Sequence, residues 1–173
     1  MKNFKRLKIS RIFVILTLLA IFILISAISY VDAVSNNISD SVFRLHVIAN
    51  SDSEEDQTLK LKVRDNLLEY MNTIAKDSTN KEEAMRIASE HKNEFIQIAE
   101  KTIRENGYEY TVNIQIGKAD FPTKYYGDIT LPAGEYDALK VEIGEAKGKN
   151  WWCVMFPPLC FVDVSTGVVP DDS

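Results

Sequence analysis

The sequence predicts an α+β protein: a mostly antiparallel sheet with a two-helix hairpin packed on one face, preceded by an N-terminal apolar helix. Three observations lead to this prediction. An uncharged run of 20 residues, from Ile12 to Val31, lies near the start of the chain. One strand-like segment and two segments with helical periodicity follow it. Three or four further strand-like segments complete the order.

The N-terminal run has the composition of an export signal. Five basic residues and no acidic residue precede it, as in a secretory signal or an anchor whose N-terminus stays in the cytoplasm. A 20-residue helix spans roughly 30 Å, the thickness of a bilayer core, which favours a retained anchor. Small residues at Ala27 and Ser29 fit a signal-peptidase site and make cleavage an equal alternative. We therefore expect a signal peptide or membrane anchor at residues 1–31.

The rest of the chain suits a short spacer at residues 32–41 and one exported domain at residues 42–173. All 25 acidic residues but only 15 of the 20 basic ones follow the apolar run, which gives the exported part a net charge of −10. A domain of that charge is not expected to bind nucleic acid or anionic lipid headgroups.

Two helices are predicted in the first half of the exported domain. The first covers about residues 53–75 and begins at a capping-box pattern that starts at Ser51. Apolar residues three or four apart line one face of it: Leu59, Val63, Leu67, Met71 and Ile74. A second capping box starts at Thr79, and the helix that follows is expected to run without a break to Gly107. The short connection predicts that the two helices pack as a hairpin.

Strands are predicted at residues 42–50, 108–116, 139–143 and 151–156. A short extended piece is expected around Ile129, within a segment rich in proline and glycine. On the first strand, Arg44 and His46 alternate with apolar residues and are expected on the face turned away from the core.

Two cysteines, Cys153 and Cys160, follow the membrane segment. An exported domain permits a disulfide between them, and two buried free thiols are an equal alternative because free cysteine packs well among apolar residues. Their spacing does not fit a structural zinc site, and the chain has no glycine loop for phosphate. We therefore expect no metal and no cofactor.

One enzymatic alternative remains, a cell-envelope Cys–His hydrolase with Cys153 as nucleophile and His46 as base. The apolar neighbours Trp152 and Val154 argue against it, because they would raise the pKa of the Cys153 thiol. The sequence therefore favours a protein that is not an enzyme.

The segment from Asn150 to Asp163, NWWCVMFPPLCFVD, is the most distinctive in the chain. Adjacent tryptophans on a strand point to opposite faces, so one of them lies outside the core or is covered by other residues. Tryptophan is enriched among interface hot spots. The hypothesis is a partner-binding patch made of Trp151, Trp152, Phe156, Pro157 and Pro158. The alternative is a core strand with a covered outer face.

Three segments resemble the stage II sporulation protein R family of endospore-forming bacteria. They are FRLHVIANSD at 43–52 with DQTLKLKVRDN at 56–66, PAGEYDALKVEIG at 132–144, and GKNWWCVMFPPLCFVD at 148–163 with TGVV at 166–169. With the apolar run they cover nearly the whole chain. Relatives often extend further at the C-terminus, so we expect a short or absent tail here.

The resemblance implies an intercellular signal of sporulation. Similar proteins are made in the forespore and exported into the space between the forespore and mother-cell membranes. There they activate a membrane-embedded aspartic peptidase of the mother cell, which removes the pro-segment of the sigma-E factor. Catalysis belongs to that partner. The resemblance brings no interface residues with it.

Overall fold

A computed structural model gives the fold and describes residues 2–126 and 129–160. The family-like segment at 166–169 and the end of the segment at 148–163 lie outside these residues. The chain divides into two compact units, residues 1–37 and residues 38–173. Each unit is described by itself.

The first unit is the helix α1 (Lys2–Ser39). Its stretch Phe13–Tyr30 has a mean hydropathy of 2.6 and is long and apolar enough to cross a membrane. The side chains of this stretch are exposed within the protein. This confirms the predicted N-terminal apolar helix. The helix also continues through most of residues 32–41, the range predicted as a spacer.

The second unit contains a four-stranded sheet in the order β2-β5-β1-β6. Its strands are β1 (Phe43–Ile48), β2 (Val112–Phe121), β5 (Gly134–Ile143) and β6 (Asn150–Phe156). The pairs β2–β5 and β1–β6 are antiparallel, but the central pair β1–β5 is parallel. The sheet is therefore mixed, and the prediction of a mostly antiparallel sheet is only partly right. The α+β class itself is confirmed.

The parallel pair follows from the chain path. After β1 the chain runs through all the helices of the domain before it enters β2, and β5 then folds back antiparallel beside β2. This places β5 between β2 and β1, parallel to β1. A parallel pair requires such a long crossover, usually through helices, and the region after β1 supplies it.

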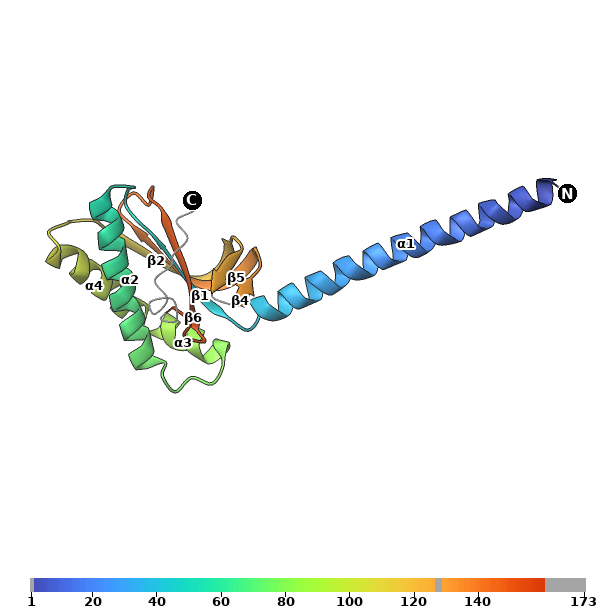
Figure 1. Ribbon diagram of the computed structural model, residues 1–173. Coiled ribbons are helices and arrows are strands. Elements are labelled where there is room, and N and C mark those ends of the chain that lie inside the picture. Colours follow the sequence, from blue (N-terminus) through green and yellow to red (C-terminus); the bar gives the residue numbers. More distant parts are fainter. Residues whose placement is uncertain (1, 127–128, 161–173) are drawn as a thin grey trace. The chain divides into compact units, whose positions relative to one another are not determined.

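Three helices lie on one side of the sheet, as Figure 1 shows. They are α2 (Glu54–Ile74), α3 (Lys81–Glu90) and α4 (Lys92–Glu105). The expected unbroken second helix is wrong, because His91 leaves helical geometry (φ −100°, ψ 21°) and separates α3 from α4. The break lets α4 pack along α2 and β2, while α3 contacts β1 and β2.

The helix starts also differ slightly from the predicted caps. Ser53, not Ser51, caps α2 and accepts a hydrogen bond from the Asp56 N–H. The Ser51 hydroxyl instead donates to the Asp56 carboxylate (2.6 Å). Asn80, not Thr79, caps α3. Each cap lies one or two residues after its predicted position, since several polar side chains compete for the same N–H groups.

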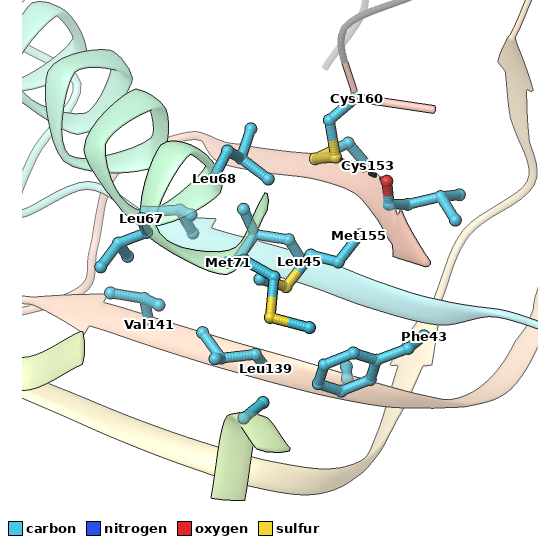
Figure 2. Close-up of a cluster of buried hydrophobic side chains, with 14 of the residues drawn as sticks. Phe43, Leu45, Leu67, Leu68, Met71, Leu139, Val141, Cys153, Met155 and Cys160 are labelled. Carbon is cyan, nitrogen blue, oxygen red and sulfur yellow. Dashed lines mark hydrogen bonds between the residues drawn. A yellow bond between two sulfur atoms is a disulfide. The ribbon is translucent and has the colours of Figure 1, made fainter. Parts of the chain in front are cut away.

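The hydrophobic core lies between the helices and the sheet. Figure 2 shows side chains of α2 meeting those of β1 and β5, and the cluster includes Leu45, Leu67, Met71, Leu139 and Val141. These five side chains are almost fully buried. Burial of each such side chain stabilises the fold by roughly 1.5–3 kcal/mol relative to exposure.

A two-stranded ribbon follows β2 and precedes β5. It consists of β3 (Lys124–Tyr126) and β4 (Ile129–Leu131), and among the described residues it pairs with no strand of the main sheet. The extended piece expected around Ile129 is β4. The strand predicted at 108–116 begins and ends later, as Val112–Phe121.

Candidate functional site

The two tryptophans of β6 lie on opposite faces of the sheet. Trp151 is on the helix-covered face, where the Arg64 guanidinium lies 4.0 Å from its ring centroid. Trp152 is on the other face and stacks on His46, with centroids 3.6 Å apart and planes 20° apart. Both tryptophans are half-buried. The side chains predicted to bind a partner therefore do not form one continuous surface around the two tryptophans.

The chain after β6 is held against the end of that strand. Cys153 and Cys160 form a disulfide with a Cα–Cα distance of 5.3 Å. The N–H groups of Leu159 and Cys160 both donate to the Val154 carbonyl, each at 3.2 Å. Pro157 and Pro158 are exposed at the turn so formed, and Phe156 is half-buried.

The structure does not bring the residues of a Cys–His hydrolase together. Cys153 pairs in register with Leu45 and faces the helices, whereas His46 is on the opposite face. Cys153 is also held in the disulfide, so no thiolate is present to act as nucleophile. The geometry therefore gives no support to the hydrolase alternative.

Replacing both Cys153 and Cys160 by alanine is expected to lower the free energy of unfolding by about 2–3 kcal/mol. The cross-link joins residues seven apart, and its loss frees the unfolded chain. Urea unfolding of the full chain in detergent micelles measures the change. Wild-type protein in excess dithiothreitol is the control and should match the variant. A difference below about 0.5 kcal/mol between oxidised wild type and variant would contradict this account.

A buried arginine is the centre of the face that the helices do not cover. Arg44, on β1, is 0% exposed. Its Cζ atom lies 4.0 Å from the ring centroid of Phe121 and 4.6 Å from that of Tyr136. Its Nη2 donates to the Tyr126 hydroxyl (2.9 Å). The guanidinium is therefore enclosed by aromatic side chains from β2, β3 and β5.

Among the described residues, Arg44 has no carboxylate partner of the kind that a buried cation usually has. No acidic side chain of the described residues forms a salt bridge with Arg44, and its Nε and Nη1 have no hydrogen-bond partner. Burial is the main cause that lowers the pKa of Arg44 below its ordinary value, although the Tyr126 and Tyr136 hydroxyls act in the opposite direction. Each unpaired buried donor costs roughly 1–3 kcal/mol or more, and the two rings offset part of that through cation–π contact.

His46 lies next to Arg44 on the same face. Its Nε2 is 2.7 Å from the Asn150 Oδ1, and its Nδ1 is buried without a partner among the described residues. Burial lowers the pKa of His46 to about 4, against the hydrogen bond to Asn150, which raises it. The ring is therefore neutral near pH 7, with Nε2–H donating to Asn150.

The cluster formed by Arg44, His46, Phe121, Tyr126, Tyr136 and Trp152 is called here the outer cluster. Sequence reasoning placed Arg44 and His46 on the face turned away from the core, but nothing in the alternation shows what lies above a strand. Three of the aromatic residues, Phe121, Tyr126 and Tyr136, come from the segment around Ile129 that is rich in proline and glycine. The density of aromatic side chains in that segment is the one signal that could have indicated a packed cover.

The outer cluster has no metal-binding composition. Across the residues that the structure describes, no group of three or more His, Cys, Asp or Glu side chains could hold a metal ion. What the cluster offers chemically is a cation with unpaired donors beside stacked aromatic rings. A guanidinium in these surroundings has the chemistry to orient an anionic or planar group.

Comparisons with known proteins assign the chain to a family. No solved structure matches it. The stage II sporulation protein R of Bacillus subtilis (strain 168) is 44% identical over 130 residues, which is 75% of this chain. The chain spans 58% of the length of that relative. The family model for stage II sporulation protein R matches residues 39–166, which include all strands and helices of the second unit. The chain therefore belongs to the stage II sporulation protein R family.

Proposed function

We propose that this protein is an exported sporulation signal that activates a membrane-embedded aspartic peptidase of the mother cell. That peptidase then processes the pro-sigma-E factor. The protein itself is not the catalyst. Membership in a sporulation family is the observation that carries the proposal, and activation of the peptidase is what the resemblance of the three sequence segments implies.

The N-terminal helix supports the exported location in this proposal. The stretch Phe13–Tyr30 can cross a bilayer, and the basic residues before it favour an N-terminus that stays in the forespore cytoplasm. The second unit would then lie in the space between the two membranes. It stays tethered to the forespore membrane if the helix is not cut, and is released if it is.

Activation by a protein without a catalytic role requires differential binding. The second unit must bind the active arrangement of the peptidase more tightly than the inactive one. For an aspartic peptidase, the favoured arrangement can be one in which two half-sites meet. The predicted contact residues Trp151, Trp152, Phe156, Pro157 and Pro158 are the first positions to test, on both faces of the sheet.

A deletion strain tests the proposed function directly. Cells that lack this protein should keep sigma-E in its pro-form, and wild-type protein supplied in the forespore should restore processing. Immunoblots of sigma-E through sporulation measure the conversion. A matched variant without residues 2–31 should fail to restore it, because it is not exported. Processing on time in the deletion strain would refute the proposal.

Separate Trp151→Ala and Trp152→Ala variants in the same strain test the contact residues. Because the two side chains lie on opposite faces, each variant reports on one face. We expect Trp152→Ala to slow processing more, since no helix covers its face. Proteolysis of the exported protein checks that each variant is folded. If both variants fold and process sigma-E like wild type, the tryptophans are structural.

A further inference from the structure

We propose that Arg44 is the binding site for a single carboxylate group of a partner protein. The inference rests on the proposed function only for the identity of that partner, the peptidase. The site is the guanidinium of Arg44 between the rings of Phe121 and Tyr136.

Unpaired hydrogen-bond donors are the first reason. Arg44 is 0% exposed, yet Nε and Nη1 have no acceptor among the described residues. Two other buried cations have acceptors: Lys81 donates to the Asp137 carboxylate at 2.6 Å on the opposite face, and Lys60 donates to the Gln57 amide oxygen and the Lys149 carbonyl. A buried charge without a counter-ion among the described residues is rare in a structure selected for stability alone, and it favours a binding role.

The chemistry of the cluster selects the ligand class. A guanidinium is a planar donor that matches the two oxygens of a carboxylate. The Phe121 and Tyr136 rings flank the guanidinium, which favours a planar group over a bulky one. The exported part carries a net charge of −10, which disfavours anions with several charges such as phosphate. A side-chain or terminal carboxylate with one negative charge fits all three conditions.

The path to Arg44 passes the Tyr126 side chain. The Tyr126 hydroxyl lies 2.9 Å from Nη2 and 3.3 Å from the Trp152 carbonyl, so it bridges the guanidinium and β6. Tyr126 belongs to β3, which pairs only with β4 among the described strands. A rotation of the Tyr126 side chain would uncover Arg44 at the cost of these two hydrogen bonds, while the backbone pairing of the main sheet stays intact.

Neighbouring residues on this ribbon favour a protein as the source of the carboxylate. Outside α1, the exposed large apolar side chains of the described residues are Tyr125 (72% exposed) and Ile129 (47% exposed). Both are on the ribbon that carries Tyr126. A partner that buries them would bring its own acidic group to Arg44.

Formate is the probe for the site. The full chain in detergent micelles is titrated with sodium formate, and the Arg44 Nε–H signal is followed by NMR, assigned by its loss in Arg44→Met. We expect a saturable shift, with half-saturation on the order of 10 mM for so small a ligand. Sodium chloride at equal ionic strength should give no saturable shift. Phosphate should bind more weakly than formate.

Lys140→Met is the matched control. Lys140 is on the same face but is paired with Glu142 at 2.6 Å, so this variant should bind formate like wild type. A shift that does not saturate, or that chloride reproduces, would overturn the inference. Tighter binding of phosphate than of formate would overturn the ligand class.

Processing of sigma-E provides the second readout. Arg44→Met should lose at least tenfold in processing rate while its resistance to urea is unchanged or higher, because methionine removes an unpaired charge. Full processing by Arg44→Met would show that Arg44 has only a structural role. If Arg44→Met accumulates poorly, the formate titration of wild type decides. If the deletion strain processes sigma-E normally, the proposed function fails, whereas the formate result stands by itself.

Discussion

Replacing Asp137 with asparagine is expected to lower the free energy of unfolding by about 3–5 kcal/mol. The Lys81 ammonium, on α3, donates to the Asp137 carboxylate at 2.6 Å, and both side chains are buried. Asparagine leaves a buried lysine without its counter-charge, which is costly in the protein interior. Urea unfolding of the full chain in detergent micelles at pH 7 measures the change.

Lys118→Met is the control for this prediction. Lys118 also approaches Asp137, at 3.4 Å, but its side chain is 48% exposed. Its removal should cost no more than about 1 kcal/mol, since exposed ion pairs contribute little. A change below about 1 kcal/mol in Asp137→Asn would show that the buried pair does not hold α3 on the sheet.

The Lys81–Asp137 pair also predicts how the stability of the domain depends on pH. Burial alone would raise the pKa of Asp137, but the hydrogen bond and charge of Lys81, with the charge of Lys118, outweigh it and hold the pKa below its ordinary value. The stabilisation is therefore complete above the unfolded pKa of about 3.9 and is lost as the pH falls through the lower folded pKa. The Asp137→Asn variant should lack this loss of stability at low pH.

Acidification from pH 7 to pH 4 is expected to destabilise the wild-type domain through His46 by about 3 kcal/mol. The pKa of His46 is about 4 in the folded protein, mainly because of burial. It is about 6.5 in the unfolded chain. Between these values the unfolded chain binds a proton that the folded protein does not, so stability falls as the pH falls. Above pH 6.5, His46 is neutral in both the folded and the unfolded protein, so it adds no pH dependence to the stability.

His46→Phe isolates this contribution. Phenylalanine can keep the stack on Trp152 but cannot take a proton, so stability should fall less between pH 6.5 and pH 4. Urea unfolding at half-unit pH steps gives the two curves, and their difference reports His46 alone because carboxylates titrate in both proteins. Neighbouring charges enter too: Lys140 and Arg44 lower the pKa of His46, whereas Glu142 raises it. Parallel curves would contradict a buried neutral His46.

Local sequence patterns predicted where most elements lie. Alternation with period two located β1 and β5, because successive strand side chains point to opposite faces whatever the partner strand is. β6 was located as a short apolar run that ends at two prolines. Apolar residues three or four apart located α2, because such residues lie on one face of a helix. The break at His91 was missed, since it depends on where α3 and α4 each pack and not on a local breaker residue.

The candidate site was predictable only in part. The sequence placed Trp151 and Trp152 on opposite faces of a strand, and the structure agrees. It could not show that the face of Arg44 is covered. The contact between Arg44 and Tyr126 joins residues 82 apart in sequence, and that between His46 and Asn150 joins residues 104 apart. No local sequence pattern predicts contacts between residues so far apart in the chain.

By itself, the sequence determined the apolar N-terminal helix, the places of most strands and helices, and the family. These depend on composition, short-range periodicity and sequence motifs, and each of these features lies within a single segment of the chain. Only the tertiary structure decided the parallel pairing of β1 with β5, the disulfide between Cys153 and Cys160, and the enclosure of Arg44 by aromatic rings. Each of these arises where separate segments meet, and burial there changes the charge and hydrogen bonding of the side chains.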